Sequence, residues 1–306
     1  MNFFAEHHTR KNIFKMTKKT IITSVALTII SAGLIFSSCK KKQKDDDDTT
    51  AAEDHVVAET QSNDIVNIGD QASYGSMTTY KLGQQPQESI YSACATITSY
   101  TANSADNDTL IVNFGSSCIG ADGRTRSGIL QYVYTAGLHY TDSGNVISVS
   151  ANNYVVDGNA VNISSKTIKN LGHITANKLT WAIDANITIN KADGKTITWT
   201  TSKTRVLLAG EQPNNLPVDW AHTQIAVYGT ASGTSANGES FTASVAQASW
   251  LVRDFNCTGY RKCFVAGELD FTPASKLTRY VNFGTGACDN LASVTINGNV
   301  YNITLK

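Results

Sequence analysis

The stretch KLTWAIDANITIN (residues 178–190), followed by Asp193-Gly194 and by KTITWTT (residues 195–201), decides the fold class. In both segments apolar or aromatic residues alternate with polar ones, which is typical of strands with one buried face. The Asp-Gly pair suits the positive φ angles of a two-residue type I′ turn, whose twist matches the strands that it joins. The stretch therefore predicts an antiparallel β-hairpin.

The same period-two pattern recurs on both sides of this hairpin. Segments rich in β-branched and aromatic residues occupy residues 109–114, 128–134, 145–150, 204–209, 223–230 and 241–250. Two further turn pairs, Asp157-Gly158 and Asn297-Gly298, separate other strands. Because short hairpins join antiparallel neighbours, we predict a single all-β domain over residues 74–306. Its strands are expected to form an antiparallel meander, folded as a sandwich or a barrel-like sheet.

Residues 51–73 carry a different pattern, which predicts one short N-terminal helix before the β domain. Small and apolar residues recur there at roughly helical spacing, and the segment contains no proline. The alternative is a segment that stays disordered until it packs on the domain.

Residues 1–38 have the layout of an export signal. Lys18 and Lys19 precede an apolar run over residues 21–36, and small residues then lead to Cys39. We expect Met16 to be the true start and Cys39 to become the lipidated first residue of the mature protein. A retained membrane helix is the alternative, but the run is shorter than the roughly 20 residues that span a bilayer. Acyl chains on Cys39 would anchor the protein stably to a membrane.

Residues 39–50 form a charged linker that is expected to be solvated, with lysines first and aspartates after them. The chain has 25 basic and 25 acidic residues. Removing residues 1–38 takes away five basic residues and one acidic residue, which leaves a net charge of about −4. Without a basic face or stripe, nucleic acid is not expected as a partner.

The most specific internal signal is a duplication that contains cysteines. Val-Asn-Phe-Gly occurs at residues 112–115, with Cys118 after it, and again at residues 281–284, with Cys288 after it. Cys94 lies 18 positions before the first copy, and Cys263 lies 18 positions before the second.

Disulfides are expected in an exported chain because its compartment is oxidising. The matched offsets predict the pairs Cys94–Cys118 and Cys263–Cys288, each worth roughly 3 kcal/mol of stability, and they leave Cys257 over. Cys257–Cys288 and Cys257–Cys263 remain alternatives, because sequence alone does not fix connectivity. With no paired Cys-x-x-Cys and no nearby histidine set, no metal site is expected at these cysteines.

Three segments resemble motifs of an uncharacterised family of Bacteroidetes lipoproteins: residues 113–129, residues 153–158 and residues 282–298. The acidic tract after Cys39 is also similar to that of surface lipoproteins in the same group. The resemblance implies a β-rich body and an outer-membrane lipid anchor that is exposed at the cell surface. Attachment facing the periplasm is the alternative. The family carries no activity, cofactor or catalytic residue that could be transferred.

The sequence contains few of the motifs that indicate an enzyme. There is no Gly-x-Ser-x-Gly elbow, and the domain has only His139, His173 and His222 as candidate bases. Cys257 with His222 is the one arrangement for a thiol nucleophile. Hydrolysis of glycans needs two carboxylates about 5 to 9.5 Å apart, and the candidate acids are Asp184, Asp193, Glu211, Asp219, Glu239, Glu268 and Asp270. Calcium is conceivable at Asp122 or at Asp289-Asn290, but acidic turn residues explain both.

Trp181 and Trp199 lie on the strands that flank Asp193-Gly194. Their default role is packing in the core, and the alternative is a platform on which a sugar ring stacks. The function predicted from the sequence is therefore a lipid-anchored envelope protein with a non-enzymatic binding or structural role, without cofactor or metal. Its partner would be a glycan or another envelope protein. The alternative is an exported carbohydrate-active hydrolase that uses carboxylates near the Trp-bearing strands.

Overall fold

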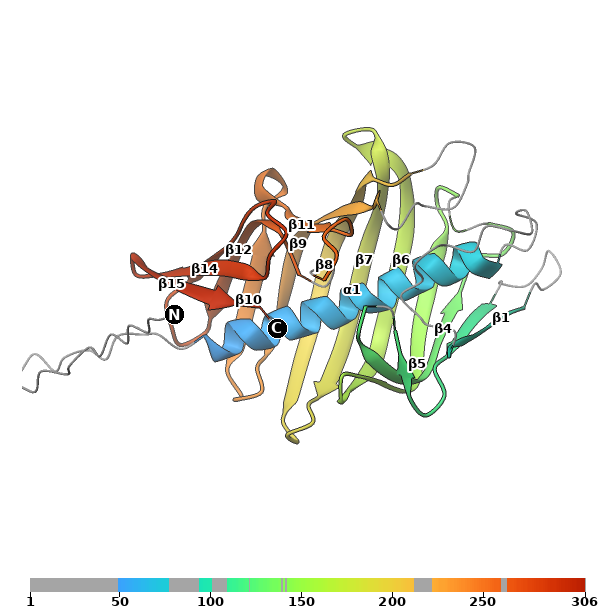
Figure 1. Ribbon diagram of the computed structural model, residues 1–306, viewed down its shortest axis with the longest axis horizontal. Coiled ribbons are helices and arrows are strands. Elements are labelled where there is room, and N and C mark those ends of the chain that lie inside the picture. The colour runs from blue at the N-terminus through green and yellow to red at the C-terminus, as the bar shows by residue number, and fades with distance from the viewer. Residues whose placement is uncertain are drawn as a thin grey trace, which may run out of the picture. The chain divides into compact units, whose positions relative to one another are not determined.

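Helix α1 (Thr50–Ser76) lies against one face of an antiparallel sheet of 15 strands in the computed structural model (Figure 1). The predicted all-β class with one N-terminal helix is confirmed, and the helix extends slightly beyond residues 51–73. The export signal, Cys39, His139 and Asp219 lie outside the described part of the chain. The structure describes residues 49–76, 94–100, 109–120, 122–138, 140, 142–211, 222–259 and 263–305.

The strands follow one another across the sheet in nearly the order of the sequence, which confirms the predicted antiparallel meander. The hydrogen-bonded order is β1-β2-β4-β5-β6-β7-β8-β9-β10-β12-β13-β14-β15. Strand β3 pairs with β4 and so prolongs β2, while β11 pairs with β9 and β12 and so prolongs β10. The bounds are β1 (Thr96–Tyr100), β2 (Thr109–Asn113), β3 (Cys118–Ile119), β4 (Thr125–Val133), β5 (Val146–Val156), β6 (Asn159–Thr175), β7 (Lys178–Asn190), β8 (Thr196–Ala209), β9 (Gln224–Thr234), β10 (Ser240–Val245), η3 (Gln247–Ser249), β11 (Leu251–Asp254), β12 (Ala266–Pro273), β13 (Arg279–Thr285), β14 (Leu291–Ile296) and β15 (Asn299–Thr304).

The predicted hairpin is β7–β8, but its turn differs from the predicted one. Lys191 donates its backbone N–H to the carbonyl of Lys195, and of the two turn residues only Gly194 has a positive φ. The connection is therefore longer than a two-residue type I′ turn. At Asp157-Gly158 and at Asn297-Gly298 both residues have positive φ angles, and the flanking residues pair directly. These two turns have the predicted type I′ geometry.

Alternation along β8 shows how the sheet divides its side chains between two faces. Trp199, Lys203 and Arg205 are buried and point toward α1, whereas Thr200 and Ser202 are exposed on the opposite side. We call the side that packs on α1 the inner face and the opposite side the outer face. Both sets contain polar residues, so the strand has a buried face that is not simply apolar.

Helix α1 is enclosed by the sheet along much of its length. Every residue from 61 to 73 is buried, although the segment contains acidic, amide and hydroxyl side chains. Among the described residues, no helix is apolar over the length that crossing a membrane requires. A helix buried on all sides is usually apolar all round, so the polar groups of α1 must find partners on the sheet.

Candidate functional site

Each of the four buried carboxylates of α1 contacts a basic side chain from the sheet. We call these contacts the helix–sheet seam: Asp54 with Lys191 at 2.8 Å, Glu59 with Lys203, Asp64 with Arg126 at 2.7 Å, and Asp70 with Arg205 at 2.5 Å. Buried charges are tolerated where they are paired and hydrogen-bonded. The seam therefore fixes both the position and the rotation of α1 on the inner face.

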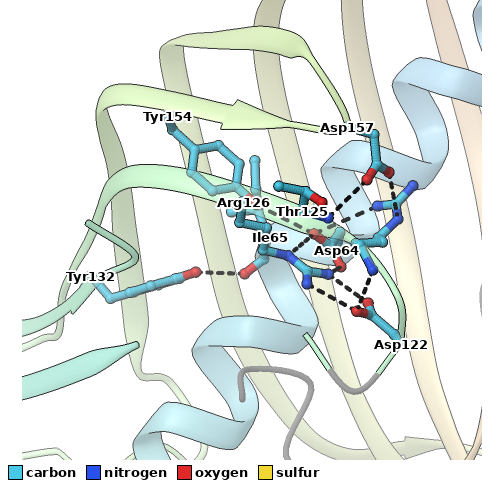
Figure 2. Close-up of polar contacts among 9 residues, drawn as sticks. Asp64, Ile65, Asp122, Thr125, Arg126, Tyr132, Tyr154 and Asp157 are labelled. Atoms are coloured by element: carbon cyan, nitrogen blue, oxygen red, sulfur yellow. Dashed lines mark hydrogen bonds and ion pairs between the residues drawn. The ribbon is translucent and has the colours of Figure 1, made fainter. Parts of the chain in front are cut away.

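Arg126 is the centre of the seam (Figure 2). Its Nε and Nη2 donate to the two oxygens of Asp64 at 3.0 and 2.7 Å, and its Nη1 and Nη2 donate to Asp122 at 3.0 and 2.6 Å. The guanidinium thus forms paired hydrogen bonds with two carboxylates, the strongest geometry available to arginine. Arg124 Nη1 lies 3.6 Å from Asp64, and Tyr154 donates its hydroxyl to the same carboxylate at 3.3 Å.

The pKa shifts agree with this geometry. Burial alone would raise the pKa of Asp64, but the nearby Arg126 and Arg124 outweigh burial and hold it below the usual value. Burial alone would lower the pKa of Arg126, but Asp64 and Asp122 raise it. Asp70 differs, because burial raises its pKa to about 6 and Arg205 offsets this only in part.

A close approach between α1 and β4 accompanies the seam. Tyr132 donates its hydroxyl to the backbone carbonyl of Ile65 at 2.6 Å. A Cβ atom at Gly69 would lie 2.5 Å from Cε1 of Tyr132, closer than side-chain atoms approach each other. Glycine at this position lets the tyrosine ring lie against the helix backbone.

Lys166 is a buried cation of the inner face. It contacts a hydroxyl of α1, whereas the cations of the helix–sheet seam contact carboxylates. Its Nζ donates to Ser62 Oγ at 2.7 Å, and burial lowers the pKa of its ammonium to about 7. A lysine beside a serine suggests nucleophilic chemistry. Both side chains are about 2% exposed, however, so a substrate would not reach them. We assign the pair to the core.

The variant Lys166→Met is expected to be more stable than the native chain at pH 7 and below. Between pH 7 and about 10.5 the folded state binds fewer protons at Lys166 than the unfolded state does, so native stability rises with pH. In the variant, the slope of the free energy of unfolding against pH should be smaller by up to about 1.4 kcal/mol per pH unit. Urea denaturation across this pH range measures it. A variant that is less stable at pH 6, with an unchanged slope, would contradict the assignment.

Trp181 and Trp199 are both 1% exposed, so neither ring offers a face on which a ligand could stack. Trp199 donates its Nε1–H to His55 Nδ1 at 3.1 Å, and the guanidinium of Arg205 lies 4.9 Å from the ring centre of Trp181. Burial, and to a smaller extent Lys203, lowers the pKa of His55 well below 6.5, so this histidine is neutral. Trp181 and Trp199 therefore pack in the core and do not form a stacking platform, because both side chains point to the inner face of the sheet.

The duplicated motif forms the same local structure twice. In each copy the asparagine side-chain oxygen accepts a hydrogen bond at 2.8 Å from the glycine backbone N–H, Asn113 from Gly115 and Asn282 from Gly284. Both glycines have positive φ angles, which this tight turn requires. The phenylalanine between them is buried in both copies. The repeat therefore shapes the end of a strand and its following loop.

The disulfide pairing is confirmed in the first copy and wrong in the second. Cys94 is bonded to Cys118 as predicted, but Cys288 is bonded to Cys257 rather than to Cys263. A β-bulge between Ala266 and Glu268 shifts the register of β12 against β13. Cys263, which precedes β12, is buried, and Cys257 from the turn after β11 is the partner of Cys288.

Replacing Cys288 by serine is expected to lower the free energy of unfolding by about 3 kcal/mol, because the disulfide closes a loop of 31 residues. Cys263→Ala serves as the control and should leave both disulfides intact. Peptide mapping without reductant identifies the linked fragments. Recovery of a Cys263–Cys288 peptide from the native chain would contradict this pairing.

The candidate catalytic acids do not gather in one place. Glu211 lies 2.6 Å from His173, Glu239 contacts Ser275 and Lys276, and Asp193 lies in the β7–β8 turn. Glu268 and Asp270 share the outer face of β12, but both are exposed and Glu268 accepts a hydrogen bond from Asn282. The carboxylate of Asp122, a candidate calcium ligand, accepts a hydrogen bond from the guanidinium of Arg126. In the described part of the chain, no group of three or more His, Cys, Asp or Glu could hold a metal ion.

A groove of about 890 Å³ crosses the outer face over strands β6 to β13. Two rows of outward side chains form its sides. Their members on β7, β8, β9, β10 and β12 are in register from strand to strand, and the rows end at Thr278, just before β13, and at Tyr280 on β13. The first row is Asn186, Thr200, Ser232, Thr242, Thr272 and Thr278, and the second row is Asp184, Ser202, Thr230, Ser244, Asp270 and Tyr280. We call this feature the outer groove.

The floor of the outer groove is made by small residues whose side chains point inward: Ala185, Thr201, Ala231 and Ala243. They pair with one another from strand to strand. Small side chains in this position let the backbone approach the core, which is how a groove can form on the far side of the sheet. The groove could not be predicted from the sequence, because its rows come from several strands and local sequence patterns do not determine how those strands are aligned.

Five hydroxyl groups in the groove make no hydrogen bond within the described part of the protein. In the described residues, the side chains of Thr200, Ser202, Ser232, Thr242 and Ser244 make no hydrogen bond to another protein group. Thr272 and Thr278 bond to each other at 3.0 Å. The outer groove can therefore offer several donors and acceptors to a ligand, whereas the helix–sheet seam is buried and already paired.

No protein-family model matches the chain, and neither curated proteins nor solved structures show a significant match.

Proposed function

We propose that this chain is a lipid-anchored cell-envelope protein with a non-enzymatic binding role, and that the outer groove is its binding surface. The observation that carries the binding role is the groove itself, an open surface of unengaged hydroxyls on a sheet whose opposite face is closed by α1. The sequence supports the anchor through the apolar run at residues 21–36 and Cys39. The two disulfides fit an oxidising compartment.

Binding is a better account of the groove than hydrolysis. Its two carboxylates, Asp184 and Asp270, lie on β7 and β12, which are four strand positions apart. Neighbouring strands lie about 4.8 Å apart, so the separation along the sheet is about 19 Å. Paired-carboxylate glycosidases hold their acids about 5 to 9.5 Å apart. The described residues of the groove lining also include no Trp of the kind that would accompany such a site.

The anchor is tested by metabolic labelling of the full chain with a palmitate analogue in a bacterium that processes lipoproteins. We expect label on the native chain and none on Cys39→Ala. Protease treatment of intact cells then separates the two orientations, because a surface-exposed protein is cleaved and a periplasm-facing one is protected. A native chain without label would refute the anchor.

A further inference from the structure

The two rows of the outer groove present a repeating pattern across the strands. Thr200 pairs with Ser232 and Ser232 with Thr242 in the first row, while Ser202, Thr230 and Ser244 are aligned in the second. Strands β8, β9 and β10 thus each contribute one hydroxyl side chain on each side of the groove. A ligand lying along the groove would meet a pair of hydroxyls at each of these three strands.

The chemistry of these groups favours a polyhydroxylated ligand. Each hydroxyl donates one hydrogen bond and accepts others, which is also what the hydroxyls of a sugar do. Because five of these hydroxyls, all on β8, β9 and β10, make no competing hydrogen bond within the described residues, a sugar would replace water there without breaking protein contacts. Tyr280, 55% exposed at one end of the second row, adds an aromatic ring beside the hydroxyls.

The charge of the groove lining narrows the class of ligand further. Among the described residues, the lining contains Asp184 and Asp270 and no lysine, arginine or histidine. Anionic polymers would meet two carboxylates and no compensating cation, and like charges repel. An uncharged ligand meets no such penalty, and the carboxylates can accept hydrogen bonds from its hydroxyls.

Strand spacing sets the repeat that the ligand should have. Neighbouring strands lie about 4.8 Å apart, which is close to the length of one pyranose ring along an extended chain. A linear glycan across the strands would therefore place about one sugar over each strand, with successive rings meeting equivalent hydroxyls.

We propose that the outer groove binds an uncharged, extended glycan that lies across the strands, about one sugar per strand. This inference rests on the proposed binding function of the groove and specifies its ligand class. Five strands contribute to both rows and β13 adds Tyr280 to the second, so affinity should rise with oligosaccharide length and level off near six sugars.

The test uses the full chain, solubilised in detergent, and calorimetric titration with β-1,4-linked glucose oligomers of increasing length. A helical α-1,4-linked series and an anionic galacturonate series serve as comparison ligands. We expect binding of the straight neutral series, strengthening with length and insensitive to salt, and no binding of the anionic series. Thr200→Val/Thr242→Val should weaken the binding at least tenfold, because valine keeps the shape of threonine and removes its hydroxyl.

Thr198→Val/Thr234→Val is the matched control, since these residues pair on the same face of β8 and β9 but do not line the groove. It should bind like the native chain. No binding of neutral oligomers, tighter binding of the anionic series, or equal losses in both double variants would overturn the glycan proposal. Circular dichroism establishes that each variant is folded. A negative result here with successful palmitate labelling would reject the ligand class and leave the anchor standing.

Discussion

Arg126→Met is expected to destabilise the protein by about 3 to 5 kcal/mol, which is a large share of the stability of a typical domain. Methionine fills a similar volume but leaves Asp64, buried on α1, and Asp122 without their shared guanidinium. An uncompensated buried charge costs far more than the pair contributes. Urea denaturation at neutral pH, followed by circular dichroism, measures the loss.

Two variants define the origin of this effect. Arg124→Met removes a cation that lies 3.6 Å from the same carboxylate, farther than Arg126 at 2.7 Å, and it should cost less than Arg126→Met. Asp64→Asn combined with Arg126→Met should recover part of the lost stability, because the double variant no longer buries the unpaired carboxylate of Asp64. A loss below about 1 kcal/mol for Arg126→Met alone would mean that the seam does not hold α1 against the sheet.

Trp199→Ala is expected to cost about 3 to 5 kcal/mol, the range for truncating a fully buried aromatic side chain. The ring is 1% exposed, and the loss of its Nε1–H would leave His55 Nδ1 without its hydrogen-bond donor. Chemical denaturation followed by far-ultraviolet circular dichroism avoids interference from the lost fluorophore.

Trp199→Phe is the matched control for that variant. It retains a buried aromatic ring and loses mainly the hydrogen bond to His55, so its cost should be much smaller than that of Trp199→Ala. If Trp199 were a surface platform for a ligand, both substitutions would leave stability nearly unchanged. Such a result would contradict the inward orientation of β8 at this position.

Local patterns in the sequence predicted the strands well, because each depends on neighbouring residues. Alternation over residues 178–190 and 195–201 predicted β7 and β8, and two of the three Asx-Gly pairs form the expected turns. The turn at Ala176-Asn177, where both residues have positive φ angles, has no glycine to mark it.

Features that depend on distant residues did not follow from the sequence. Asp64 and Arg126 are 62 positions apart, and nothing near either one indicates the other. Along β8 both phases contain polar residues, so alternation did not show whether Lys203 or Ser202 points inward. The outer groove needs the register of six strands at once, and the second disulfide joins Cys257 and Cys288, which lie 31 positions apart.

Carboxyl footprinting of the native full chain tests the central claim most directly, namely that α1 is sealed inside the sheet while the outer groove is open. A carbodiimide and an amine should label Asp184 and Asp270 in the groove. They should leave Asp64 and Asp70 unlabelled until denaturant is added, because both are buried against the sheet. Labelling of the two helix carboxylates at the rate of the groove carboxylates in the folded protein would contradict the account.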